Sequence, residues 1–360
     1  MGGGGEIAGE DGSIADLGEW GLIAALKARM PAGALTSVGI GDDSAVVTAP
    51  SGSVVAAVDL LIEGRHFRRD WSSAYDIGVK AAARSLADIA AMGAVNTALL
   101  VALAAPGTLP ARWATELAQG LASEATRAGA GVVGGDTARA DAVTLSVTAL
   151  GDLENRRPVL RSGARPGDMI AVAGPLGHAA AGLALLAAGG PAVSVELSSL
   201  VAAQRRPAPP YGAGPEAACL GATAMIDVSD GLLADLGHVA AASGVQINVS
   251  SSRLAPDTVL REAAASLPSS PEFHRTTSAY SPPSIPQEPP PRGNLSLQNL
   301  AAIAQEWVLT GGEDHSLVAA FPPGTVLPDR WRAIGEVLPG AGVTVDGAPH
   351  AGPGGWQHFG

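Results

Sequence analysis

The sequence has a single cysteine, Cys219, which excludes an intrachain disulfide framework and any CxxC metal site. Aromatic residues make up only 4% of the chain, so alanine, valine and leucine must do most of the core packing. We expect Cys219, which lies in an alanine-rich segment, to be a small core residue. The 47 glycines indicate many turns.

Long apolar runs and basic clusters are also missing. No run reaches the roughly 18–20 residues of a membrane span. The glycine-rich, acidic segment 1–12, which we expect to be flexible, lacks the basic and apolar regions of a signal peptide. The net charge is −12 and no stretch concentrates lysine and arginine, which argues against nucleic-acid binding. We therefore expect a cytoplasmic protein with neither a membrane nor a nucleic acid as partner.

Length and periodicity indicate two domains of mixed architecture. A chain of 360 residues exceeds the size at which one core usually stops growing. Apolar spacing predicts helices over 13–30, 74–92, 111–128, 178–188 and 231–242, and strands over 53–61, 97–104, 131–133, 141–150, 169–173 and 223–228. This alternation is typical of an α/β or α+β fold. We expect an N-terminal domain over 13–152 and a C-terminal α/β domain over 153–360.

One segment differs from the rest of the chain. Eight of the 27 prolines fall between Leu267 and Arg292, among serine, threonine and glutamine. Such a composition buries too little apolar surface to offset the entropy of ordering, so 267–292 is expected to be a disordered insertion. A polyproline docking motif is the alternative.

Carboxylates recur along the chain, nearly all of them beside glycine or at the ends of apolar runs, where a side chain can leave a strand and enter a cleft. These positions are Asp42, Asp43, Asp59, Asp88, Asp136, Asp227, Asp230, Glu313 and Asp314. Carboxylates gathered in one place raise each other's pKa unless cations lie between them. Hard oxygen ligands suit Mg²⁺, which is usually held together with substrate phosphates. The pattern predicts a Mg²⁺–nucleotide site.

Each position also has an ordinary structural interpretation. Asp88 follows Arg84 by four residues and could form a surface ion pair with it. Ser229 or Asp230 could simply cap the helix that follows. Asp136 lies in Gly134-Gly135-Asp136-Thr137, which alone predicts a tight turn.

Both common nucleotide fingerprints are absent. No G-x-G-x-x-G follows a predicted strand, and Gly174-x-x-Gly177, although it precedes a helix and could contact phosphate, lacks the lysine of a P-loop. Any ATP must therefore be held in another way.

Seven strings in register carry a family resemblance. They are Gly39-Ile-Gly-Asp-Asp-Ser-Ala-Val46, Asp59-Leu-Leu-Ile-Glu-Gly-Arg-His-Phe67, Leu86-Ala-Asp-Ile-Ala-Ala-Met-Gly-Ala94, Gly134-Gly-Asp-Thr137, Arg161-Ser-Gly-Ala-Arg-Pro-Gly-Asp168, the run from Met225 to His238, and Gly311-Gly-Glu-Asp314. Together they resemble the thiamine-monophosphate kinases, which share an ATP-binding superfamily with aminoimidazole ribonucleotide synthetase and selenophosphate synthetase. The resemblance covers roughly residues 13–360, apart from the proline-rich insertion.

The resemblance implies a Mg²⁺-assisted kinase. It would transfer the γ-phosphoryl group of ATP directly, in line, to thiamine monophosphate, giving thiamine diphosphate and ADP. It also implies a homodimer whose N-terminal domains pair through β-sheet, with the active site between the two domains of a chain. By motif position, the Mg²⁺ ligands are Asp43, Asp59, Asp88, Asp136, Asp227 and Asp230; the ATP contacts are Gly135, Arg161 and Ser229; and the thiamine-phosphate contacts are His66, Glu313 and Trp356. No covalent nucleophile or general base is assigned.

Two departures from the family pattern affect the details. Ala57-Val58 replaces a frequent hydroxyl pair before Asp59, and His315-Ser316 replaces the usual Tyr-Glu after Asp314. The alternatives are another ATP-using member of the superfamily, of the aminoimidazole ribonucleotide synthetase type, and a non-catalytic nucleotide-binding protein. Selenophosphate synthetase chemistry is disfavoured, because residues 1–12 contain no reactive cysteine.

Overall fold

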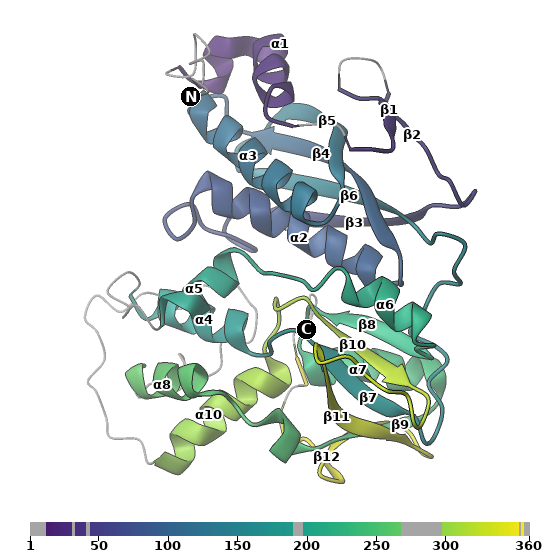
Figure 1. Cartoon of the computed structure of the whole chain (residues 1–360). Coiled ribbons are helices and arrows are strands. Elements are labelled where there is room, and N and C mark those ends of the chain that lie inside the picture. Colours follow the sequence, from purple (N-terminus) through teal and green to yellow (C-terminus); the bar gives the residue numbers. More distant parts are fainter. Residues whose placement is uncertain are drawn as a thin grey trace. The chain divides into compact units, whose positions relative to one another are not determined.

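The computed structural model describes residues 12–30, 33–40, 44–189, 197–267, 297–352 and 354–355. Apart from their end residues, the N-terminal segment and the proline-rich insertion lie outside this part. The chain divides into two compact units, coloured along the sequence in Figure 1. Unit 1 comprises Met1–Ile89 and Val95–Glu154, and unit 2 comprises Ala90–Ala94 and Asn155–Gly360.

Unit 1 is a mixed sheet with helices. Its elements are α1 (Ile14–Lys27), β1 (Thr36–Val38), β2 (Val46–Val47), β3 (Val55–Ile62), α2 (Ala74–Ala91, whose last two residues belong to unit 2), β4 (Val95–Ala105), α3 (Ala111–Arg127), β5 (Gly131–Arg139) and β6 (Thr144–Asp152). The main sheet has the order β3-β6-β4-β5; β4 and β5 are parallel, and the other two pairs are antiparallel. Ser13 caps α1 through a capping box with Asp16.

The two faces of this sheet differ. Figure 1 shows α2 and α3 side by side on one face, and strand residues such as Leu99 and Leu145 are fully buried. Along β3 the burial alternates, which leaves Val58 65% and Leu60 49% exposed on the other face. The sheet therefore has one helix-covered face and one open, partly apolar face.

Glycines in the helices have a different role from the turns that the composition suggests. A Cβ on Gly120 of α3 would lie 2.1 Å from the carbonyl oxygen of Tyr75, and one on Gly78 of α2 would lie 2.2 Å from that of Leu117. The two helices thus touch backbone to backbone, which only glycine allows. The low aromatic content fits this close packing of small side chains.

The segment Gly134-Gly135-Asp136-Thr137 is not a turn, so that interpretation was wrong. Strand β5 continues through it to Arg139. The pairing with β4 skips Val133, between the Leu99–Val132 and Leu100–Gly134 pairs, as a β-bulge does. A Cβ on Gly135 would lie 1.8 Å from the carbonyl oxygen of Val101. The glycine permits close contact between the strands rather than a reversal of the chain.

Unit 2 combines helices with a second, seven-stranded sheet. Its elements are β7 (Met169–Ala173), α4 (His178–Ala187), α5 (Ser198–Arg205), α6 (Ala213–Cys219), β8 (Ala224–Val228), α7 (Leu232–Ser243), β9 (Gln246–Val249), the 3-10 helix η1 (Ser251–Leu254), α8 (Thr258–Ser266), α10 (Leu297–Thr310), β10 (Ser316–Phe321), β11 (Trp331–Leu338), β12 (Gly342–Val345) and β13 (Ala348–Pro349). The sheet has the order β13-β12-β9-β11-β7-β10-β8. The expected mixed α/β class is confirmed.

Cys219 ends α6 and is exposed, so the expectation of a core cysteine was wrong.

Within the part of the chain that the structure describes, no helix has both the length and the apolar character needed to cross a membrane.

Candidate functional site

Asp59 of unit 1 points to the helix-covered side of β3. Its Oδ2 accepts a hydrogen bond of 2.8 Å from Ser85 Oγ on α2, and its Oδ1 lies 3.8 Å from an Arg84 guanidinium nitrogen. Asp88, half-buried, lies one helical turn beyond Ser85. The structure thus places Asp59 beside the helix that carries Asp88, and Arg84 forms an ion pair with Asp59.

Asp136 lies elsewhere in the same unit. Its strand is three positions from β3 in the sheet order, roughly 14 Å at the usual spacing between strands. Asp136 aligns with Leu60 through Ser146 and Ala102, on the open face. Within one unit the structure therefore does not bring Asp136 to Asp59.

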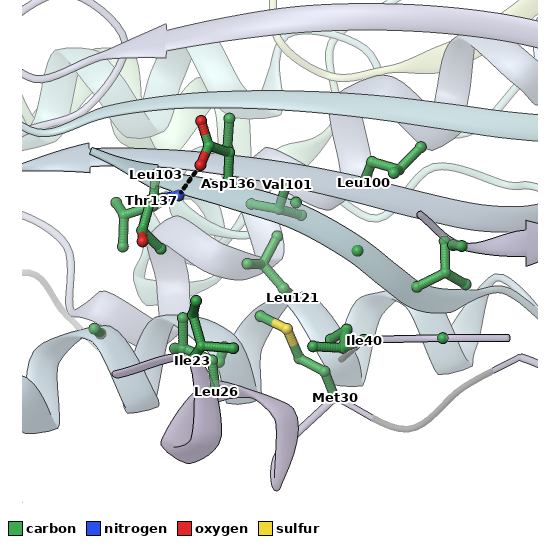
Figure 2. Close-up of a pocket in the computed structure, with 18 of the residues that line it drawn as sticks. Ile23, Leu26, Met30, Ile40, Leu100, Val101, Leu103, Leu121, Asp136 and Thr137 are labelled. Atoms are coloured by element: carbon green, nitrogen blue, oxygen red, sulfur yellow. Dashed lines mark hydrogen bonds between the residues drawn. The ribbon is translucent and has the colours of Figure 1, made fainter. Parts of the chain in front are cut away.

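A cavity of about 850 Å³ lies beside β5 in unit 1. Its walls are more apolar than polar and come from α1, α3, β4, β5, β6 and the segment around Ile40 and Ala45. Figure 2 shows Leu100 and the Asp136 carboxylate on one side of the strands, with Leu26 and Leu121 on the other. Gly134 and Gly135 also line the cavity. Its volume falls in the range usual for small-molecule sites.

His66 follows β3 and is held by its own backbone segment. Its Nδ1 accepts a hydrogen bond of 3.0 Å from the Ile62 amide. An accepting Nδ1 fixes the neutral ring with its proton on Nε2. His66 therefore presents an N–H donor on the side of the ring away from Ile62.

In unit 2, Asp227 has a buried partner near the end of its strand. Asp227 is the next-to-last residue of β8. Asp227 and His315, which lies directly before β10, are 3% and 2% exposed, and Asp227 Oδ2 lies 3.0 Å from His315 Nδ1. The two strands pair antiparallel here, since Leu317 stands opposite Asp227. Asp227 therefore lies at the strand end that precedes α7, as expected from the sequence.

Asp235 adds a carboxylate that the sequence interpretation did not single out. Its Oδ2 accepts hydrogen bonds of 3.1 Å from the amides of Asp230 and Gly231, directly before α7. Burial, together with the negative charges of Asp227 and Asp230, raises the pKa of Asp235 to about 8. The three carboxylates are therefore close enough to repel one another.

The cap of α7 differs from the expected one. The residue before the helix is Gly231, with φ of 123°, and its cap has no side-chain hydrogen bond. The Asp235 carboxylate reaches back to the amides instead, so the expectation of Ser229 as N-cap was wrong. The sequence did contain a signal for this role of Asp235. A serine or aspartate lies before the helix and a carboxylate follows a few residues later, a pattern that resembles a capping box.

The donor set in unit 2 fits a hard divalent cation. Asp230, Asp235 and His238 each offer a ligand atom, and these atoms lie within 4.8 Å of one another. A cation there would relieve the repulsion that raises the pKa of Asp235. Carboxylate oxygens are the ligands that Mg²⁺ prefers.

The Gly177 amide of the Gly174-x-x-Gly177 segment is not free to bind a phosphate. Asp314 is buried, and its two oxygens accept hydrogen bonds from the amides of Gly177 and Ala179 at the start of α4. Burial raises the pKa of Asp314 to about 6, and the two amides oppose that shift. A carboxylate of the chain itself thus occupies this helix N-terminus.

Glu313 lies close to the Asp227–Asp230 segment. Its amide donates to the carbonyl of Ser229 at 2.8 Å, and Gln204 Nε2 lies 3.3 Å from its Oε2. Arg161 is exposed, and its carbonyl accepts from Ser243 Oγ at 3.1 Å. Ser243 ends the 12-residue helix α7, so the Arg161 main chain is about 18 Å along the helix from its start.

Asp43 and Trp356 lie outside the described residues. Sequence reasoning missed Ser85 and Asp235, and it noted His315 only as a departure. Ser85 and His315 have no local signal, because their partners are far away in the sequence.

The free energy of unfolding should fall as pH rises, because of Asp235. The folded chain holds its proton up to about pH 8, whereas the unfolded chain releases it near pH ~4. Between these values the folded state binds more protons, so rising pH destabilises it by at most about 1.4 kcal/mol per pH unit.

Comparing wild type with Asp235→Asn isolates this effect from that of Asp314. The asparagine side chain keeps an oxygen that can accept from both backbone amides, and it does not titrate. We expect wild type to lose stability relative to Asp235→Asn from pH 5 to 8 in urea unfolding without metal. Added Mg²⁺ should reduce the difference; parallel pH profiles without metal would contradict the prediction.

Comparison with known proteins places the chain in a family. The family model described as "AIR synthase related protein, N-terminal domain" matches residues 41–153. The thiamine-monophosphate kinase of Mycobacterium tuberculosis (strain H37Rv) is 44% identical over 358 residues, covering 98% of this chain and 95% of the relative. That of Bacillus subtilis (strain 168) is 32% identical and covers 88% and 86%.

Solved structures agree over similar lengths. Thiamine-monophosphate kinase from Stenotrophomonas maltophilia K279a has a TM-score of 0.71 at 29% identity, covering 91% of this chain and 95% of its own. The structure described as "AaThiL complexed with AMPPCP and TMP" has a TM-score of 0.70 at 30% identity, covering 96% and 98%. The expected resemblance is confirmed, and the chain belongs to the thiamine-monophosphate kinase family.

Proposed function

We propose that this chain transfers the γ-phosphoryl group of ATP to thiamine monophosphate, giving thiamine diphosphate and ADP. One observation carries the proposal: the relative described as complexed with AMPPCP and TMP matches 96% of this chain at 30% identity. The clustered carboxylates of unit 2 support it, because phosphoryl transfer depends on positioning and charge neutralisation. Cytoplasmic localisation stays a prediction.

The aspartates would hold Mg²⁺ around the phosphates. Asp59 and Asp88 in unit 1, and Asp227 and Asp230 in unit 2, are the proposed ligands; Asp43 stays a prediction. Asp136, three strands from Asp59 on the other face, would serve a separate ion. Bound Mg²⁺ supplies charge neutralisation to the β- and γ-phosphates.

The remaining predicted contacts divide between the two substrates. Gly135, Arg161 and Ser229 are proposed for ATP, and the apolar cavity beside Gly135 has the volume that a nucleoside needs. For thiamine phosphate, His66 would donate its Nε2–H, and the buried Glu313 carboxylate suits a cationic ligand. Trp356 is predicted to stack on the thiazolium ring.

The transfer is proposed to be direct. The acceptor is a phosphate that is mostly ionised near neutral pH, so no general base is required. In-line attack of its oxygen on the γ-phosphorus forms the new P–O bond as the bond to ADP breaks. Isolation of a covalently phosphorylated chain on the reaction path would contradict this.

The decisive experiment incubates the purified chain with Mg²⁺, ATP and thiamine monophosphate and measures thiamine diphosphate by chromatography. Formation of thiamine diphosphate in proportion to ADP is expected. Omission of Mg²⁺ and replacement of ATP by AMPPCP are the controls. ATP binding without product would favour the non-catalytic alternative.

We also propose that two copies pair through the open face of the unit 1 sheet. The support is the apolar exposure of Val58 and Leu60 on β3, which is an edge strand of that sheet. Contiguous exposed apolar surface of this kind marks interaction sites. Val58 of the Ala57-Val58 departure fits this role, since it places an apolar side chain on the open face where the family often has a hydroxyl.

Val58→Asp should therefore weaken the dimer. Buried in a two-fold interface, the change places an unpaired carboxylate in each copy. We expect the dimer dissociation constant to rise at least about a hundredfold, roughly 2.7 kcal/mol, in analytical ultracentrifugation. Val326→Asp is the control, at a valine that is 86% exposed in unit 2. Equal behaviour of the two variants would rule out this face.

A further inference from the structure

His315 precedes β10 and faces Asp227 across the paired strands. Its amide donates to the Val228 carbonyl at 2.9 Å, which continues the β8–β10 ladder by one residue. The backbone there has φ of 51°, and Glu313 two residues earlier has φ of 69°. Outside glycine such values are strained and persist only where the surroundings impose them.

The contact with Asp227 has a defined direction. A carboxylate that binds a cation can only accept, so in that state the 3.0 Å bond is donated by His315 Nδ1–H to Asp227 Oδ2. The ring contacts Oδ2 and not the second oxygen, Oδ1. The ring therefore occupies one oxygen of Asp227 and leaves the other for a cation.

Packing alone does not account for a histidine here. The ring is 2% exposed, and among the described residues its Nε2 has no hydrogen-bond partner. A buried polar atom without a partner destabilises the fold, and an apolar side chain of similar size would avoid that cost. Among the described residues, the hydrogen bond of the ring is to Asp227, so that bond is what the histidine contributes.

The neighbouring charges make such a contact useful. Asp227 shares its surroundings with Asp230 and Asp235, and the charges of both Asp227 and Asp230 act on Asp235. Without a fixed donor, repulsion from these carboxylates would favour other rotamers of Asp227. A hydrogen bond to a ligand from a second residue typically changes metal affinity or activity by about 10–100-fold.

We propose that His315 is a positioning residue, which holds Asp227 by Nδ1–H so that its free oxygen binds a divalent cation of the metal–ATP complex. This inference rests on the proposed function, in which Asp227 is a metal ligand. His315 does not touch the reacting atoms and is not a catalytic residue.

Two substitutions separate donation from mere polarity. In His315→Asn the side-chain N–H₂ replaces Nδ1, and asparagine tolerates a positive φ. In His315→Gln the amide lies one bond further out, so polarity is kept and the contact is lost. Thermal unfolding of both variants shows whether each folds as wild type does.

Metal binding is then measured without turnover. Mn²⁺ is titrated into the full chain with AMPPCP and followed by electron paramagnetic resonance, with Mg²⁺ as competitor. We expect the Mn²⁺ dissociation constant to rise about tenfold or more in His315→Gln and less than threefold in His315→Asn. In the kinase assay, half-saturation by Mg²⁺ should shift in the same order, while KM for thiamine monophosphate stays unchanged.

Equal Mn²⁺ affinities in all three proteins, or an equal loss in both variants, would overturn the role of His315. A wild-type chain that forms no thiamine diphosphate would overturn the proposed function instead, and the Mn²⁺ titration would still decide whether His315 supports the metal site.

Discussion

Asp230→Asn is expected to lower kcat by about a hundredfold to a thousandfold while leaving the fold intact. Asp230 is half-buried directly before α7, and its amide is held by Asp235. The substitution keeps the backbone amide and a side chain of nearly the same shape, but it removes the negative charge. Turnover falls because the transition-state charge on the phosphates is less well stabilised, and a single preorganised group contributes an effect of about this size.

The measurement is steady-state kinetics over a range of Mg²⁺ concentrations, together with thermal unfolding. Partial recovery at high Mg²⁺ would identify the loss as one of metal binding. Asp329→Asn is a matched control, because Asp329 is exposed in unit 2 and belongs to no proposed site. Near-normal turnover in Asp230→Asn would remove this residue from the site.

Gly120→Ala is expected to destabilise the protein by about 2 kcal/mol. The added Cβ would lie 2.1 Å from the Tyr75 carbonyl oxygen and 3.0 Å from the Val79 amide nitrogen. These are backbone atoms of α2, so the helices must separate, and overpacking of this kind costs about 1–3 kcal/mol or more. The cost exceeds the gain of about 0.8–1.0 kcal/mol that alanine brings inside a helix.

Gly237→Ala provides the opposite case in the same chain. Gly237 lies within α7, and a Cβ there meets nothing within 4 Å. Only the helix-propensity gain remains, so we expect a small stabilisation. Urea unfolding of both variants tests the pair. A Gly120→Ala midpoint at or above that of wild type would show that α2 and α3 do not depend on this contact.

Local pattern predicted many elements well. The strand 169–173 was placed at its observed bounds, and the helices near Ala74 and Ala111 were placed within about one residue. These segments have regular apolar spacing and clear ends, such as Gly93 with φ of 76°. For them, the preferences of the local sequence and the final packing agree.

The failures share a physical cause. Gly134-Gly135 suggests a turn locally, yet in the sheet it allows close approach to Val101. Ser229 is a good capping residue, yet Asp235 takes the amides. In each case a neighbour in space, or several residues away, outweighed the preference of the nearest residues.

By its residues and their order alone, the sequence determined the mixed α/β class, the kinase family and the acidic positions at strand ends. Motif identity and hydrophobic periodicity are properties of the chain itself. Tertiary structure alone decided which carboxylates have partners: Asp59 with Ser85, Asp227 with His315, and Asp235 with the amides before α7. Two of these partners are distant in the sequence, and burial sets their electrostatics, so only folding could reveal them.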